Sequence, residues 1–464
     1  MDTSCSNSLK PSRRKIAEQI ARISLPAVVT NISVPLLSIV DTAIVGHMGA
    51  QKYIGAVAVG GVIFNVLYWV FAFLRMGTSG LTSQAFGRGD RRDIALQLSR
   101  PLALAAVFGL LLVTLGGVAA DVAFAFISAS DDVEPLAREY FRTGIFGAPA
   151  VLGWYAFSGW FLGMQNSRYP MVVAITQNLV NIAASLFFVY VLGFGIKGVA
   201  LGMVTAQYTG LAMCVALWRI KYASGLPRPE WAEVFDVRGM SRFFSVNKDI
   251  FLRTVCIVFV MSYFTSAGAA MNDTVLAVNA LLMQLFIIFS YFMDGFAYAG
   301  EALVGRYVGE RNRPAFSMVV RQLLYVGAAL AVVFTLFYFA GGRGFLSMLT
   351  DDNATVSAAM VYLPWAACVP VVSFGAFVLD GVCIGATASR VMLLSSFLAA
   401  VVFFNMFILL RGMAGNNALW AAFLAYLAVR TLVNAAFYGR LVRHTFVLPQ
   451  KKWQLTVYFD NLAT

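Results

Sequence analysis

Charged residues are scarce in this 464-residue chain, where they make up 12% of the sequence against 60% hydrophobic residues. A soluble protein carries about 25% charged residues. The longest polar stretch, residues 221–248, is too short to fold as a soluble domain. Apolar runs recur along nearly the whole length, and a membrane span needs about 20 apolar residues. The sequence therefore predicts a multi-pass membrane protein.

Motifs of catalysis and cofactor binding are also missing. The sequence has no HExxH, no GxSxG and no Walker lysine, which excludes the common routes to hydrolysis, including that of ATP. Its five cysteines show no CxxC or metal-ligand spacing, and four of them lie in apolar runs as small buried side chains do. A GxGD sequence at Gly87–Asp90 lies in a basic loop and not in a span opposite a second aspartate. We therefore expect no enzyme, no cofactor and no metal, and transport must draw on an ion gradient.

Basic residues are abundant, and their distribution predicts orientation. The net charge of +12 could indicate a nucleic-acid partner, but Lys and Arg gather in alternate short loops, which is the positive-inside pattern. Basic loops lie at 88–92, 219–248 and 306–313, whereas two of the alternate loops are acidic, at 131–134 and 351–352. We expect a plasma membrane protein (the inner membrane in a bacterium) with both termini in the cytoplasm and no nucleic-acid partner.

Twelve apolar segments, separated by Gly, Pro, Asn, Asp or basic clusters, are predicted to be membrane-spanning helices. They run over 20–46, 54–79, 94–120, 136–163, 170–192, 198–219, 250–271, 275–304, 315–340, 358–385, 391–410 and 418–439. The predicted fold class is an all-α polytopic membrane protein.

Short motifs repeat at a fixed distance. GRGDRR at Gly87 returns as GERNRP at Gly309, and GWFLGMQNSR at Gly159 returns as GVCIGATASR at Gly381. The separation is 222 residues in both cases (309 − 87 and 381 − 159), and chance matches would not keep one register over that distance.

The repeat predicts two six-helix lobes. We expect an amino-terminal lobe over 1–225, a cytoplasmic linker loop over 226–248 and a carboxy-terminal lobe over 249–464. Because six is even, the two lobes enter the membrane in the same direction. They should be related by an axis along the membrane normal, with substrate sites near the midplane.

The first apolar run, Pro26 to Gly49, combines two prolines with one carboxylate. A proline inside a helix removes a backbone hydrogen bond and favours a bend, so Pro26 and Pro35 are predicted hinge residues. A carboxylate in the membrane costs roughly 2.5–3.5 kcal/mol on the insertion scale and usually binds ions or relays protons. Asp41 is therefore the predicted ion-coupling residue, and its alternative role is a structural hydrogen bond to the fifth or sixth helix.

Further ionisable residues lie within the predicted spans. Asp294 and Glu301 are seven residues apart on the eighth predicted helix, so they share a face that would line a cation path. Glu301 alternatively pairs with Arg306 or Arg75, and Arg75 would neutralise either Asp294 or Glu301. Asp380 lies beside Gly381 and Gly385, whose Gly-xxx-Gly spacing allows close helix packing. It either binds a transported ion or substrate or makes a buried hydrogen bond where the helices pack.

Three other polar residues are assigned to the membrane interface. Arg253 and Arg430 lie close to the ends of predicted spans, where we expect their side chains to snorkel. His47 ends the first span and is expected to be interfacial in preference to carrying protons.

Methionine and aromatic side chains suit an adaptable cavity for flat hydrophobic cations, through dispersion and cation–π contact. Lipid-facing helices are rich in phenylalanine as well, and composition alone does not separate the two. The candidate cavity residues are Tyr68, Met76, Trp154, Tyr155, Met283, Gln284, Tyr291, Asp294, Glu301 and Asp380.

Four motifs carry a resemblance to a known family. They are Pro26 with VDTAIVGHMG from Val40, QAFGRGD from Gln84, DGFAYA from Asp294 and LDGVCIGA from Leu379. Through them the chain resembles the MATE (multidrug and toxic compound extrusion) transporters of the MOP superfamily, and within them the DinF (DNA-damage-inducible) branch. The resemblance implies a twelve-helix monomeric antiporter that exports organic, often cationic or amphiphilic, compounds in exchange for H⁺ or Na⁺.

The resemblance also implies an ion-coupling site in the amino-terminal lobe. Asp41 matches the family's helix-one aspartate, and Asn181 matches the helix-five asparagine, with Asn178 one turn before it. Where the family has an aspartate one turn later, this chain has Ser185, and where it has a threonine in helix six, this chain has Met203. Sodium prefers several hard oxygen ligands, so the depleted set favours H⁺ over Na⁺.

The sequence thus predicts a cation-coupled, alternating-access exporter of drugs and toxic compounds in exchange for H⁺. The alternative is a lipid or lipid-linked oligosaccharide flippase of the same superfamily. A flippase would need clustered arginines for a pyrophosphate, whereas the membrane-embedded charge reads as mainly acidic. A third class is a receptor or an intramembrane hydrolase.

Overall fold

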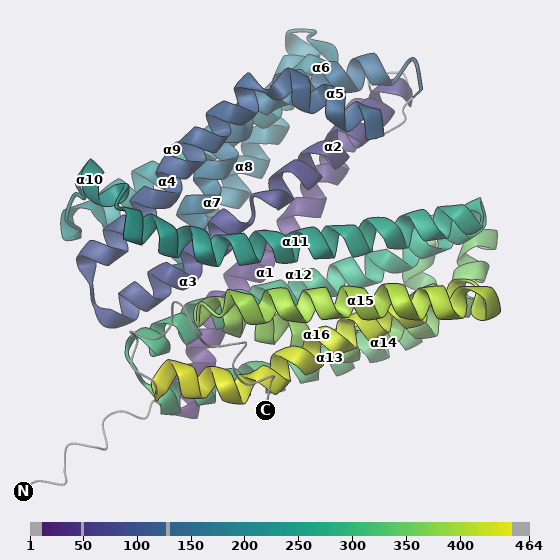
Figure 1. Ribbon diagram of the computed structural model, residues 1–464. Coiled ribbons are helices and arrows are strands. Elements are labelled where there is room, and N and C mark those ends of the chain that lie inside the picture. Colours follow the sequence, from purple (N-terminus) through teal and green to yellow (C-terminus); the bar gives the residue numbers. More distant parts are fainter. Residues whose placement is uncertain (1–11, 48–50, 127–129, 448–464) are drawn as a thin grey trace, which may run out of the picture.

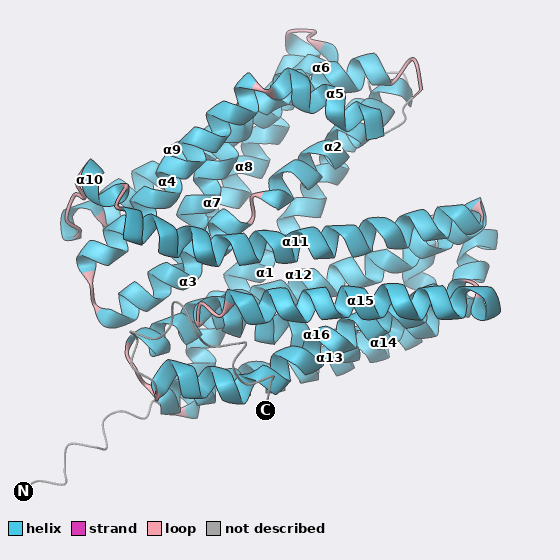
Figure 2. Cartoon of the chain, viewed as in Figure 1, coloured by secondary structure: helices cyan, strands magenta, loops and turns pink. Residues whose placement is uncertain are grey.

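The computed structural model describes residues 12–47, 51–126 and 130–447, and the regular elements among them are all helices (Figure 2). The chain ends 1–11 and 448–464, and the last two residues of the run ending at Gly49, lie outside this description. The amino-terminal half contains α1 (Arg13–Gly46), α2 (Gln51–Val70), α3 (Phe73–Arg88), α4 (Arg91–Thr114), α5 (Gly116–Phe126), α6 (Glu134–Gly144), the short η2 (Ile145–Gly147), α7 (Ala148–Gly163), α8 (Arg168–Leu186), the π-helical η3 (Phe187–Val191) and α9 (Gly195–Lys221).

The second half follows a short connection. This connection holds η4 (Ala223–Gly225) and α10 (Trp231–Val234), and the helices after it are α11 (Val237–Met271), α12 (Asp273–Gly309), α13 (Arg313–Leu349), α14 (Asn353–Gly385), α15 (Ser389–Ala414) and α16 (Asn416–Phe446). Much of the predicted linker is therefore helical. The Asp236 carboxylate accepts a hydrogen bond from the Gly239 amide at 2.9 Å and caps α11 well before the predicted start of its span.

Eleven helical segments in the described part of the chain are long and apolar enough to cross a membrane. Together with α1, 34 residues long and containing the first predicted span, they confirm the predicted total of twelve. Two spans are interrupted by turns that the sequence did not predict, between α2 and α3 and between α4 and α5. The second turn lies at Leu115, directly before Gly116 and Gly117, and glycine has a low helix propensity.

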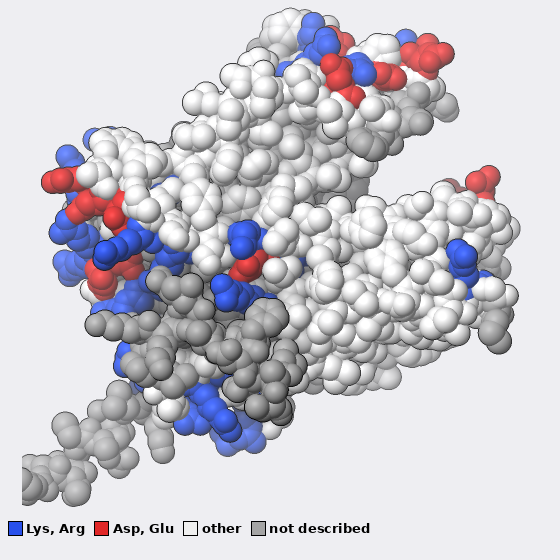
Figure 3. Space-filling model, in the orientation of Figure 1, with Lys and Arg blue, Asp and Glu red and all other residues white. Residues whose placement is uncertain are grey.

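The helices form two lobes, α1 to α9 and α11 to α16 (Figure 1). The lobes lie together at the end where α3 and α12 finish and diverge toward the opposite end, where Figure 3 shows a hollow between them. Lys, Arg, Asp and Glu gather at the two ends of the molecule, and the surface between is almost uncharged, as expected for a bilayer-facing belt (Figure 3).

The backbone repeats with the register seen in the sequence. Among the described residues, Gly89 and Arg311 both have positive φ (69° and 54°), and so do Gln165 and Thr387 (63° and 54°). Members of each pair are 222 residues apart. A positive φ is uncommon outside glycine, so two matched pairs confirm two pseudo-symmetric six-helix bundles.

The lobes are tightly packed at the end where α3 and α12 finish, next to the basic loops 88–92 and 306–313. We call this region the basic-end contact. A Cβ on Gly80 of α3 would overlap the backbone carbonyl of Ile384 on α14. A Cβ on Gly305 of α12 would lie 2.8 Å from the Ser83 Cβ and 3.1 Å from the Gly385 carbonyl oxygen. Small residues thus let α3, α12 and α14 approach at backbone distance.

Hydrogen bonds from two amide side chains of the first lobe cross the same contact. Gln84 Nε2 donates to the Gly385 carbonyl at 2.9 Å and to Thr387 Oγ1 at 3.2 Å. Gln165 Nε2 donates to the Ala302 carbonyl at 2.7 Å. Thr387 and Gln165 form one of the two left-handed pairs of the repeat, and strained positions of this kind gather at functional regions.

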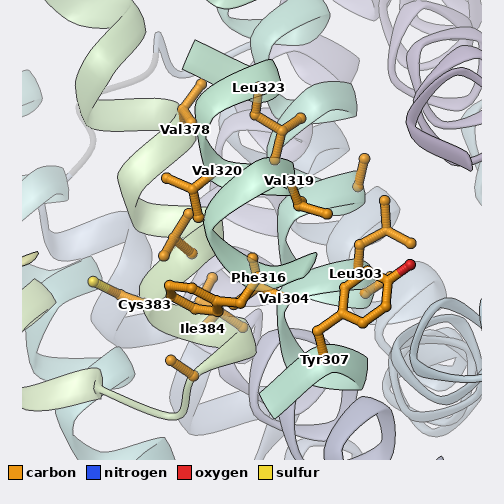
Figure 4. Packing of buried hydrophobic residues seen from close by; sticks show 14 of the residues in the cluster. Leu303, Val304, Tyr307, Phe316, Val319, Val320, Leu323, Val378, Cys383 and Ile384 are labelled. Atoms are coloured by element: carbon orange, nitrogen blue, oxygen red, sulfur yellow. The ribbon is translucent and has the colours of Figure 1, made fainter. Parts of the chain in front are cut away.

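The largest apolar core lies inside the second lobe, between α12, α13 and α14. Figure 4 shows its central side chains, Leu303, Val304, Tyr307, Phe316, Val319, Val320, Leu323, Val378, Cys383 and Ile384. The start of α1 joins it through Ile16, Ile20 and Ile23. Because α1 packs along both α12 and α8, it connects the core of one lobe to the interior of the other.

Candidate functional site

Asp41, at the far end of α1, accepts hydrogen bonds from α8. Asn181 Nδ2 donates to Asp41 Oδ1 at 3.2 Å and to Oδ2 at 3.3 Å. Ser185 Oγ donates to Asn181 Oδ1 at 3.0 Å, which fixes the amide so that its nitrogen faces the carboxylate. Asn181 and Ser185 are buried, whereas Asp41 is half-buried. The structure thus brings together three of the four predicted ion-coupling residues.

The fourth predicted residue, Asn178, contacts the backbone of α1. Its Nδ2 donates to the Ser33 carbonyl at 3.0 Å. Pro26 leaves the Arg22 carbonyl without its helical partner, and Ser167 Oγ donates to that carbonyl at 3.3 Å. The helix continues through both Pro26 and Pro35, so the hinge role of the two prolines stays a prediction.

The second lobe has no carboxylate where the first lobe has Asp41. The positions 222 residues after Asp41, Asn181 and Ser185 are Tyr263, Phe403 and Phe407. Their rings meet edge to face, with centroids 6.2 Å apart between Tyr263 and Phe403 and 5.8 Å apart between Tyr263 and Phe407. Aromatic rings thus fill this position in the second lobe. The fold therefore does not require an acid at the equivalent position, Asp41, in the first lobe.

The second lobe instead contains a charge cluster on Asp380. Arg430 Nη2 donates to Asp380 Oδ2 at 2.6 Å, Asn434 Nδ2 donates to Oδ1 at 2.9 Å, and Arg253 Nη2 also donates to Oδ2. These side chains come from α11, α14 and α16, and all four residues are buried. The cluster joins three helices inside the lobe.

The prediction that Arg253 and Arg430 snorkel was wrong. Because α11 starts at Val237, Arg253 is 16 residues into its helix, about 24 Å from its start. A buried arginine that far from water needs a partner, and Asp380 supplies the counter-charge. The expectation that the embedded charge is mainly acidic was also wrong, since Arg75 is buried as well.

Arg75 forms an ion pair with Glu301, one of the two acids that the sequence offered as its partner. Its Nη1 and Nη2 lie 3.3 and 3.4 Å from Glu301 Oε2 and Oε1, a two-pronged arrangement. Its guanidinium lies over the Tyr298 ring, 4.1 Å from the centroid. The pair joins α3 of the first lobe to α12 of the second. Glu301 and Asp380, both predicted to line a cavity, are therefore bonded to arginines inside the protein.

The remaining cavity candidates are spread over both lobes. Tyr68 is buried with its ring stacked on Phe64, and Trp154 and Tyr155 touch one another, with centroids 5.6 Å apart. The other four have these placements: Met76 and Met283 are partly buried against the cores, Gln284 is exposed, and the Tyr291 carbonyl accepts a hydrogen bond from Asn31 at 3.1 Å. Asp294 is half-buried. No group of three His, Cys, Asp or Glu residues within the described ranges could hold a metal ion.

Sequence reasoning did not identify Asn434, Gln84 or Gln165 as bonded polar groups. Each is an amide side chain within or next to an apolar run, and this alone marks a polar group that needs a partner in the membrane. The partner itself comes from another helix, which hydropathy does not report.

Comparisons with known proteins agree with this geometry. The MatE family's sequence model matches residues 26–187 and 250–409, one match in each lobe. The chain is 34% identical to DNA damage-inducible protein F of Escherichia coli over 423 residues, covering 90% of this chain and 91% of that protein.

Solved structures with the same fold come from more distant proteins. A MOP superfamily transporter from Pyrococcus furiosus, described as having a binding pocket of reverse polarity, has a TM-score of 0.84 and 16% identity, covering 94% of this chain and 97% of that one. An outward-facing multidrug resistance MATE transporter has a TM-score of 0.84 and 17% identity, covering 93% and 96%. At this identity the likeness establishes the fold.

Proposed function

Because the chain belongs to the MatE family of membrane transporters, in its DinF branch, and is not an enzyme, we propose that it exports organic cations and amphiphiles in exchange for protons. The observation that carries the proposal is Asp41, a half-buried carboxylate inside a membrane helix. Within the described part of the chain it is bonded to one neutral amide and to no cation. A carboxylate in this setting is the expected place for a transported ion to bind.

The orientation of Asn181 favours a proton over Na⁺. The amide turns its nitrogen toward Asp41, and its oxygen accepts from Ser185. Neither Asn181 nor Ser185 therefore presents an oxygen atom beside Asp41 that could bind Na⁺ together with the carboxylate. Sodium requires several oxygen ligands. A proton needs only one carboxylate oxygen.

Protonation of Asp41 would change its attachment to α8. A new O–H bond on one carboxylate oxygen removes an acceptor, and Asn181 Nδ2 has only hydrogens to offer. One of the two Asn181–Asp41 hydrogen bonds is then lost. Since α1 also packs on the core of the second lobe through Ile16 and Ile20, a shift of α1 at Asp41 changes how the lobes sit together, and this is the step that would release substrate.

The charge distribution supports a direction for the cycle. With the basic loops in the cytoplasm, the basic-end contact closes the cytoplasmic side and the hollow between the lobes opens outward, in a bacterial inner membrane. Alternating access then requires α3 to separate from α12 and α14. All the groups named here belong to one chain, so a monomer suffices.

The test is dye efflux from proteoliposomes under an imposed pH gradient and, separately, under a Na⁺ gradient. We expect efflux in the pH gradient only, and we expect Asp41→Asn to reduce it to the level of empty vesicles. The matched control is Asp273→Asn, which removes one exposed carboxylate from the start of α12. Wild-type efflux by a folded Asp41→Asn protein, judged by its elution profile, would contradict the proposal.

A flippase stays the second candidate, because four arginines of the predicted spans are buried among the described residues. Arg75, Arg253 and Arg430 are bonded to carboxylates of the chain. Arg100 donates to the Glu233 and Val234 carbonyls, so none of the four is free to take a pyrophosphate. Transfer of a pyrophosphate-linked lipid across vesicles, unaffected by Asp41→Asn, would favour this alternative.

A further inference from the structure

Ionisable side chains in the middle of the described helices form a group with one unmatched member. The group comprises Arg75, Arg253, Arg430, Asp294, Glu301 and Asp380, from α3, α11, α12, α14 and α16. Two more buried ionisable residues, Arg100 and Asp249, are outside this group, because Arg100 donates to the Val234 carbonyl of α10 and Asp249 accepts from Ser389 at the start of α15. Arg75 and Glu301 neutralise one another, and two arginines share Asp380. Asp380 has one negative charge against the two positive charges of Arg253 and Arg430. Within this group of six, the remaining positive charge is balanced by Asp294.

Asp294 differs from the other acids deep within the described spans. Asp41 accepts from Asn181, Asp249 accepts from Ser389 Oγ at 2.9 Å, and Glu301 and Asp380 are paired with arginines. Among the described residues Asp294 has no hydrogen bond and no ion pair, although Arg75 and Arg253 lie within electrostatic reach. An ionised carboxylate in the membrane needs a partner or water, and the half-burial of Asp294 leaves it accessible to one.

The surroundings of Asp294 suit an organic cation. Tyr291 and Tyr298 lie three residues before and four residues after it, so they share its face of α12. Tyrosine faces attract cations by the ring quadrupole, as the Arg75 guanidinium over Tyr298 already shows in this protein. Next to Asp294, Gly295 abuts Val28 of α1, so the carboxylate lies at the level where the two lobes meet.

We propose that Asp294 sets the sign of the charge that this transporter accepts. With Asp294 ionised, the six groups sum to zero, and a monovalent organic cation finds one carboxylate without a partner. Without that carboxylate the group sums to +1, and the same place favours an organic anion. The inference rests on the proposed function, because it requires that organic ions are the substrates, and it assigns their polarity to one residue.

The experiment compares two ions of the same shape and opposite charge, tetraphenylphosphonium and tetraphenylborate. Binding to purified protein in detergent is measured for the wild type, Asp294→Asn, Asp294→Glu and Asp273→Asn. We expect Asp294→Asn to raise the Kd for tetraphenylphosphonium by about tenfold or more and to lower that for tetraphenylborate. Asp294→Glu keeps the charge and should keep the wild-type preference, and Asp273→Asn changes the net charge equally but outside the group and should behave as wild type.

Two outcomes would overturn the inference, and they differ in what they imply. If Asp294→Asn binds both ions as the wild type does, Asp294 does not set polarity, while pH-driven efflux dependent on Asp41 would still uphold the proposed function. If the wild type binds neither ion and no dye leaves the vesicles in a pH gradient, both proposals fail. Should Asp294→Asn not fold, Asp294→Ser provides a second neutral variant, judged by the same reversal of preference.

Discussion

Removing the Asp380 carboxylate should destabilise the second lobe far more than removing one of the arginines that share it. Asp380→Ala leaves Arg253 and Arg430 buried without a counter-charge. Breaking a buried ion pair by deleting one partner costs about 3–5 kcal/mol, and this substitution strands two arginines at once. Arg430→Met keeps a long side chain and leaves Arg253 and Asp380 as a neutral pair, so its cost should be less than half as large.

The size of the effect allows a clear measurement. For a unit of roughly 200 residues, such as the second lobe, 1 kcal/mol shifts the unfolding midpoint by about 2–4 °C. Asp380→Ala should therefore lower the midpoint by roughly 6–20 °C. A thiol-reactive dye in detergent follows the transition in a background from which every cysteine except Cys383 has been replaced, since Cys368 is exposed in the folded protein. Cys383 is buried one turn after Asp380 and becomes reactive when the lobe opens.

Equal losses of thermal stability in Asp380→Ala and Arg430→Met would refute the reasoning, since packing and not charge would then decide the result. A midpoint unchanged by Asp380→Ala would show that the cluster does not hold the lobe together.

Two further predictions concern the basic-end contact and a helix start. Gly305→Val places a side chain against Ser83, so the contact should fail to close, and spin-label distances across it should lengthen; Gly344→Val, where space is open, should leave them unchanged. Hydrogen bonds from Thr355 and from the Ala354 and Thr355 amides hold the pKa of Asp352 below its usual range. The contribution of Asp352 to stability is therefore complete above the pKa of an unfolded aspartate and is lost as the pH falls through the lower pKa of the folded state. Amide hydrogen exchange at the start of α14 should therefore become faster in acid. Asp352→Asn should make the rate of this exchange depend less on pH.

The fold followed from the sequence because its two signals are local. Span length and apolar composition mark each helix, and the separation of Gly87 from Gly309 marks the repeat, which the left-handed pairs at Gln165 and Thr387 then reproduce. The Arg75–Glu301 pair was within reach of the same repeat, since it aligns α3 with α12.

The charge cluster of the second lobe did not follow from the sequence, for a specific physical reason. Hydropathy locates the part of a helix that is apolar, but α11 extends through the polar segment 237–248, where hydropathy indicates a loop. The hydropathy pattern therefore places Arg253 at the end of a span, although it lies in the middle of α11. Which acid neutralises it depends on contacts between α11, α14 and α16, and no single segment encodes those contacts.

The length of α1 has a mechanical consequence. Residues 16 and 41 are 25 positions apart on one helix, about 37 Å along its axis. The first turns of α1 pack on the core of the second lobe, and Asp41 at its other end is bonded to α8 of the first lobe. If α1 moves as one continuous helix through Pro26 and Pro35, it would therefore act as a lever between the lobes. Tilting it by about 10° sweeps the tip through roughly 6 Å. A hydrogen bond gained or lost at Asp41 would then change the packing at the opposite end of α1, without a series of side-chain contacts between the two places.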